Sequence, residues 1–187
     1  MNVMTKLNLD DLSSPDPKVK YACCKSVLTV AAARPAELYP HLDSFIGMLE
    51  SANRIVRWTA IDVVGAMGRV EQVKTVDGLI DRLVPMLDTG NMITANHAIA
   101  ALADIARARP EHRQRITDET LNVEGYRYDT DECRNIAIGK AIVAIDSYFA
   151  GLADRQPALE FVRRQLANPR AATAGKAARF LCKHGRH

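Results

Sequence analysis

The sequence predicts an all-α protein built from repeated pairs of antiparallel helices, that is, an α-solenoid. One pattern of apolar residues occurs five times, at intervals of 37, 38, 40 and 37 residues. A period near 40 residues is typical of proteins that stack helix pairs. Sustained alternation of polar and apolar residues, which would predict strands, is nearly absent. The five copies begin near Val19, Val56, Thr94, Arg134 and Ala171.

Each copy begins with a pattern that predicts one amphipathic helix. In the second copy, Ala60, Val64 and Met67 stand four, eight and eleven residues after the start. These steps return to one face of a helix with 3.6 residues per turn. The fifth copy places Gly175 and Arg179 at apolar positions of the pattern. We therefore expect this copy to be a terminal capping helix with a polar outer face.

A second apolar pattern predicts a second helix in most copies. Proline is tolerated in a first helical turn, and Pro35, Pro110 and Pro157 stand where these helices are expected to begin. Polar residues in the breaker clusters are expected to cap helix starts. The candidate caps are Ser14, Asn53, Asn91, Asp131 and Asn168.

These boundaries predict one domain, residues 1–187, of about four antiparallel helix pairs plus a terminal helix. The expected repeats span about 14–51, 52–89, 90–131 and 132–168, followed by the capping helix over 169–187.

The stretches SPDPKVKYACCKSVLTVA and SANRIVRWTAIDVVGAMG resemble HEAT or HEAT-like repeats, which are α-solenoid repeats of the armadillo type. Val19-Lys20 and Val56-Arg57 match the paired residues of that motif, and Met86-Leu87-Asp88 matches its ending. The resemblance covers roughly residues 14 to 187. It implies a right-handed α-α superhelix with the second helices on the concave side, and it implies no particular chemistry.

Composition is ordinary for a soluble globular protein, with 48% hydrophobic and 25% charged residues. No apolar run approaches the roughly 20 residues that span a bilayer, and residues 1–12 lack a secretory signal pattern. We therefore expect a cytoplasmic protein without a membrane partner. The four cysteines form no C-x-x-C motif, so we expect neither a metal nor a cofactor.

The function that this architecture favours is a non-enzymatic protein–protein interaction scaffold, which presents a concave groove and edge loops to a partner. One candidate contact is the irregular stretch over 122–131, where Tyr126, Arg127 and Tyr128 are consecutive. Tyrosine and arginine are favoured at binding hot spots. The alternative is that the two tyrosines close the end of an interrupted repeat.

The groove is predicted to be lined by the outward residues of the second helices. These residues are weakly acidic in the first two repeats, whereas the fourth offers Glu160 together with two arginines. This change of sign suits an elongated partner of mixed charge. The candidates are Asp43, Asp77, Asp81, Arg82, Arg163 and Arg164.

Binding of nucleic acid or another polyanion through the basic C-terminal part is an alternative. After Glu160 the chain contains seven lysines and arginines and no acid, and contacts of such residues with phosphates would make binding salt-dependent. The residues are Arg163, Arg164, Arg170, Lys176, Arg179, Lys183 and Arg186. A polar cap on the last repeat explains the same charges.

Two further features allow two interpretations each. The four arginines between Arg107 and Arg115 either form a solvated edge or contact an acidic partner. Trp58, the only tryptophan, either packs between repeats or anchors a partner.

A HEAT-like enzyme, such as a lyase-type protein, is a second alternative. The five histidines lie in no H-E-x-x-H motif, and the sequence has no G-x-S-x-G or phosphate-loop motif. No catalytic residue is therefore predicted, and His97, at a core-facing position of the pattern, is expected to be a satisfied core histidine.

Overall fold

The computed structural model describes residues 7–70, 72 and 76–185. Within these ranges the chain forms nine α-helices and no strand, so the all-α prediction is confirmed. Arg186, which the sequence places in the basic C-terminal part, lies outside the described residues.

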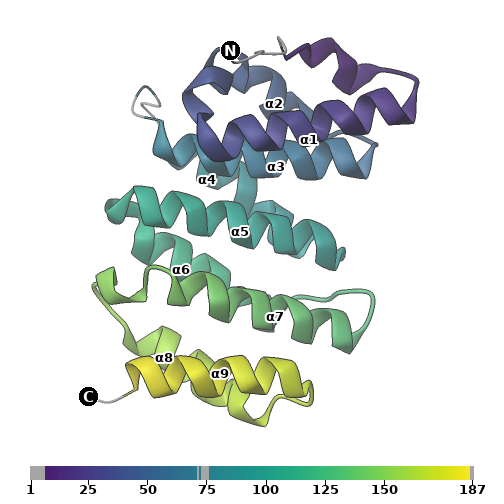
Figure 1. Cartoon of the computed structure of the whole chain (residues 1–187). Coiled ribbons are helices and arrows are strands. Elements are labelled where there is room, and N and C mark those ends of the chain that lie inside the picture. The colour runs from purple at the N-terminus through teal and green to yellow at the C-terminus, as the bar shows by residue number, and fades with distance from the viewer. Residues whose placement is uncertain (1–6, 71, 73–75, 186–187) are drawn as a thin grey trace.

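The helices form two layers (Figure 1). In the first layer each helix contacts the next one along the chain. This layer contains α1 (Pro17–Ala33), α3 (Arg54–Ala66), α5 (Met92–Ala108), α7 (Asp131–Asp146) and α9 (Ala171–His184). The second layer lies behind it in Figure 1. It contains α2 (Leu42–Met48), α4 (Val76–Leu83), α6 (Arg113–Leu121) and α8 (Gln156–Arg164).

Short 3₁₀ segments extend or join these helices. Those of the second layer are η2 (Pro35–His41), η4 (Val84–Asp88), η5 (Pro110–His112), η6 (Asn122–Glu124) and η8 (Gln165–Ala167). The others are η1 (Leu9–Ser13), η3 (Met67–Arg69) and η7 (Phe149–Gly151). As predicted, prolines stand in the first turns of η2, η5 and α8.

Two of the five predicted helix caps are confirmed. The side chains of Asn53 and Asn91 accept hydrogen bonds from the first-turn backbone of α3 and α5. The predictions for Ser14 and Asp131 are wrong, because Asp16 and Thr130 cap α1 and α7 instead. Each actual cap lies next to or near the predicted one, and the apolar pattern does not distinguish such neighbours.

The fifth predicted cap, Asn168, is also wrong, because Arg170 occupies the cap position of α9. Asn168 instead fixes the backbone just before this helix. Its side-chain oxygen accepts a hydrogen bond from the backbone N–H of Arg170, and its amide donates to Asn135 on α7.

Small residues set the distance between neighbouring first-layer helices. Ala60, Ala98 and Ala137 are completely buried. The contact of α3 with α5 is closer still, since a Cβ added at Gly65 would lie 2.5 Å from the Cα of Ala101. The backbones of the two helices therefore touch at a position where a methyl group has no room.

Arginine side chains tie successive helix pairs together at the ends of the first-layer helices. Arg69 donates hydrogen bonds to the carbonyls of Ala31 and Ala32 at the end of α1. Arg109 likewise donates to the carbonyls of Gly68 and Val70, each at 2.8 Å. The last carbonyls of a helix have no hydrogen-bond donor within that helix. Each arginine therefore supplies donors to the end of the first-layer helix in the preceding pair.

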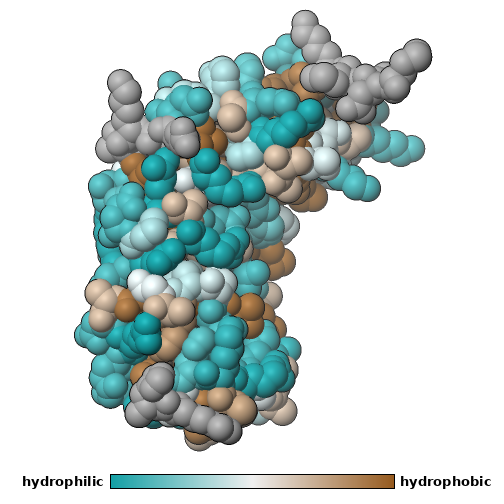
Figure 2. All heavy atoms as spheres, turned by 60° about the vertical axis from the view of Figure 1, so that its left-hand side comes forward, coloured by the Kyte–Doolittle hydropathy of each residue, from teal (hydrophilic) through white to brown (hydrophobic). Residues whose placement is uncertain are grey.

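The outline of the molecule is bent. In Figure 2 the N-terminal end projects to one side and leaves a hollow beneath it. The rotation from Figure 1 turns the first layer toward that side, so the hollow lies on the first-layer side.

Replacing Gly65 with alanine is expected to lower the free energy of unfolding by about 1–3 kcal/mol, because the added methyl group forces α3 and α5 apart. Chemical denaturation measures this change. Gly47→Ala on α2 is the matched control, since no atom lies within 4 Å of its added Cβ. The control is expected to be neutral or to stabilise by up to about 1 kcal/mol, through helix propensity alone. Equal effects of the two substitutions would contradict the packing argument.

Candidate functional site

The charged residues predicted for the second helices are all exposed. Asp43 lies on α2, and Asp77, Asp81 and Arg82 lie on α4. Arg163 and Arg164 lie in the last turn of α8. The second layer therefore carries these side chains on its outer surface.

Ion pairs between second-layer elements already use half of these residues. Arg115 on α6 pairs with Asp77 at 2.8 Å and also with Asp81. Arg164 on α8 pairs with Glu124 at 2.8 Å. Exposed pairs of this kind contribute about 0–1 kcal/mol each, so they position side chains more than they stabilise the fold.

Several acids of the second layer have no ion-pair partner among the described residues. Sequence reasoning identified Asp43 and Glu160 among them. The set is Asp43, Asp88, Asp118, Glu119 and Glu160. Asp88 ends η4, and Asp118 and Glu119 lie on α6; the outward positions of the helical pattern in these two segments carry the signal that would have identified them.

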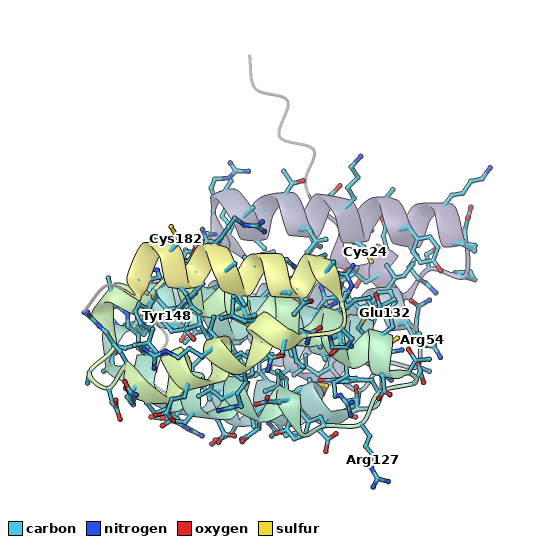
Figure 3. All side chains as sticks on the ribbon, turned by 90° about the horizontal axis from the view of Figure 1, so that it is seen from below. Cys24, Arg54, Arg127, Glu132, Tyr148 and Cys182 are labelled. Atoms are coloured by element: carbon cyan, nitrogen blue, oxygen red, sulfur yellow. The ribbon has the colours of Figure 1, made fainter. Side chains whose placement is uncertain are left out.

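The loop after η6 separates its three candidate residues. The hydroxyl of Tyr128 donates a 2.8 Å hydrogen bond to the carbonyl of Leu87. Burial, and then the charge of Asp88, raise the pKa of Tyr128 above its ordinary value. Tyr126 is also half-buried against the core, whereas Arg127 is exposed and points away from the body (Figure 3). The tyrosines thus close the end of this repeat, and Arg127 is the one exposed residue of the three candidates.

The arginines between Arg107 and Arg115 are engaged within the molecule. Arg107 pairs with Asp104, and Arg109 completes the end of α3 and η3. Arg113 donates to the carbonyl of Ala106 at 2.9 Å. The arginines of this segment therefore link neighbouring helices by hydrogen bonds.

Trp58 packs between helix pairs, as one of its two interpretations predicted. Its indole N–H donates to Thr94 on α5 at 3.0 Å, and its ring stacks on His97 at 5.6 Å between centroids. His97 is in turn 2.8 Å from Asp62. These contacts satisfy the hydrogen bonding of the histidine, as expected, but its side chain is 31% exposed and does not belong to the core.

Two open hollows of about 540 Å³ each flank Phe149 near the end of α9. Both are lined by Lys183 and His184, which share the carboxylate of Asp146 at 2.9 and 2.6 Å. Burial alone would raise the pKa of Asp146, but these two hydrogen bonds outweigh it and lower the pKa. One carboxylate therefore balances two basic groups at a helix end.

Within the described ranges, no three His, Cys, Asp or Glu side chains are placed to hold a metal ion. None of the described helices is long and apolar enough to cross a membrane.

Charge is divided unequally between the two layers. The first-layer helices carry eleven lysines and arginines against five acids. The helical segments of the second layer carry five lysines and arginines against ten acids. The small net charge of +3 hides this division, which becomes visible only when each helix is assigned to a layer.

No protein-family model matches the sequence, and no curated protein matches it significantly. The fold is similar to the crystal structure of an engineered protein, a target of the Northeast Structural Genomics Consortium. The match covers 97% of this chain and 78% of that chain, with a TM-score of 0.59 and 20% sequence identity. At this identity the likeness concerns the fold alone.

Tyr128→Phe is expected to lower the free energy of unfolding by about 1 kcal/mol, because the carbonyl of Leu87 loses its hydrogen bond. Thermal or chemical denaturation measures this loss. Tyr21→Phe is the control, since Tyr21 is 40% exposed on α1 and its hydroxyl is expected to contribute little. An unchanged stability of Tyr128→Phe would contradict the structural role of this tyrosine.

Proposed function

We propose that the chain is a HEAT-like α-solenoid whose function is to bind a protein partner, without catalysis, along the outer face of the second layer. The observation that carries the proposal is the set of exposed charges on this face that have no ion-pair partner among the described residues. Asp43, Asp118 and Glu160 provide the negative charge on three of the four helices, and Arg82 and Arg163 add positive charge. The cytoplasmic location expected from the sequence is part of this proposal.

The proposed partner is an extended protein segment that is mainly basic. Neighbouring helices in a layer pack about 8–10 Å apart, so α2 and α8 lie about 24–30 Å apart. An extended chain rises about 3.3 Å per residue, and a segment of about eight or nine residues would follow the whole face. Its acidic residues would lie toward Arg163, at the α8 end.

The structure also favours this face over the loop after η6. Tyr126 and Tyr128 are half-buried and contribute to packing, so Arg127 is the one exposed residue of the three candidates in this loop. Catalysis has less support, because Asp146, Lys183 and His184 beside the hollows are engaged in hydrogen bonds with one another.

Affinity purification from native cells, followed by binding measurements with the purified partner, tests the proposal. Asp43→Asn together with Asp118→Asn is expected to weaken binding about tenfold or more, because two charge-assisted contacts are lost. The matched control is Ser26→Lys with Thr29→Lys on α1, which changes the net charge equally on the opposite layer. The control is expected to change affinity less than twofold.

A zero-length carbodiimide cross-linker then locates the contact. Cross-links are expected between partner lysines and Asp43, Asp118 or Glu160. Cross-links confined to acids of the first layer, or undiminished binding of the double variant, would overturn the proposal.

A further inference from the structure

The acids on the first-layer helices are all engaged in ion pairs. Each has a lysine, arginine or histidine partner within 4.0 Å, on the same helix or on a neighbouring element. The pairs are Asp62 with His97, Asp104 with Arg107, Asp131 with Arg134, Glu132 with Arg170, and Asp146 with Lys183 and His184. Lysine or arginine therefore neutralises four of these five acids locally, and Asp62 is hydrogen-bonded to a histidine.

Eight basic residues of the same helices have no acidic partner among the described residues. They form two groups, one on α1 and α3 and one on α7 and α9, and α5 between them contributes none. The residues are Lys18, Lys20, Lys25, Arg54, Arg57, Lys140, Lys176 and Arg179. Positive charge thus remains at both ends of the layer.

The group at α7 and α9 is crowded. A Cβ added at Gly139 on α7 would lie 3.3 Å from Nζ of Lys176, so the lysine lies across the neighbouring helix where a side chain is missing. Burial, and then the charges of Arg170, Lys140 and Arg179, lower the pKa of Lys176. Like charges held together without a counter-charge attract an anion from solution.

The separation of the two groups fits one turn of a nucleic-acid duplex. Four helix spacings of about 8–10 Å place α1 and α9 about 32–40 Å apart. The backbone of a duplex repeats about every 34–36 Å along its axis. The hollow on the first-layer side of the molecule lies beneath the projecting N-terminal end (Figure 2), so a duplex that contacts both groups would span it.

Recognition by stacking of single-stranded bases has less support on this face. It requires several exposed aromatic rings. Of the rings on the first-layer helices, Phe180 is buried and Trp58 is stacked on His97, which leaves Tyr21 on α1.

We propose that the first-layer face binds the phosphodiester backbone of duplex nucleic acid, without reading its sequence, through Lys18 and Lys25 at one end and Lys140, Lys176 and Arg179 at the other. This activity is independent of the protein-binding function proposed above and uses the opposite face of the molecule.

Fluorescence anisotropy with a labelled 20-base-pair DNA duplex, between 50 and 200 mM salt, tests the proposal on the full chain. About five phosphate contacts would give a slope near −4.5 for log affinity against log salt, or roughly a 500-fold loss over this range. Two duplexes of unrelated sequence are expected to bind equally. Absence of binding at 50 mM salt, or a strong preference for one sequence, would overturn the proposal.

Variants at either end of the face distinguish binding by these particular residues from non-specific attraction by the net positive charge of the protein. Lys18→Gln with Lys25→Gln, and separately Lys140→Gln with Arg179→Gln, are each expected to reduce the steepness of the salt dependence by about 2. The control, Arg34→Gln with Arg155→Gln, removes the same charge from connecting segments outside the face and is expected to leave the slope unchanged. An equal effect of the control would overturn the proposal. So would binding to phosphatidylserine vesicles without binding to the duplex, because the face would then recognise an anionic membrane surface.

Discussion

The close approach of α3 to α5 is the constraint on which much of the structure depends. Because Gly65 has no side chain, its backbone touches Ala101, and the two helix pairs come close enough for longer contacts. Arg109 can then reach the carbonyls of Gly68 and Val70, and Trp58 can stack on His97. The small residue at the interface of α3 and α5 thus brings the two helices close enough for the polar side chains around it to reach their partners.

The two layers use charge in different ways. Acids in the first layer are balanced by neighbouring bases, so its remaining charge is positive. In the second layer Arg115 and Arg164 neutralise some acids, and others such as Asp118 and Glu160 keep their charge. Because the helical core separates these faces, the two proposed partners would not compete for one surface. The same division explains why a chain with nearly balanced composition can present two strongly different sides.

The sequence predicted the helical class and much of its local detail, because helix periodicity and capping are local properties. Asn53 and Asn91 cap helices as expected, and Trp58 packs between pairs. What it could not predict depends on contacts between residues about 40 positions apart. The hydrogen bond from Tyr128 to Leu87 and the pair of Arg115 with Asp77 are of this kind. In these two interactions Tyr128 and Asp77, which were predicted to contact a partner, bind other residues of the same chain. No local sequence pattern reveals such distant partners.

Most side-chain hydrogen bonds to backbone carbonyls that join successive pairs run in one direction along the chain. Arg69, Arg109 and Tyr128 each donate to carbonyls of an earlier pair, as does Thr173 to Asn135. Tyr39, which donates to the later residue Gln72, runs the other way. During synthesis on the ribosome, a helix pair therefore emerges with end carbonyls that are hydrated until the next pair supplies their side-chain donors. Each pair would reach its final stability one step after it is made, so the order of translation is also the order in which the fold is completed.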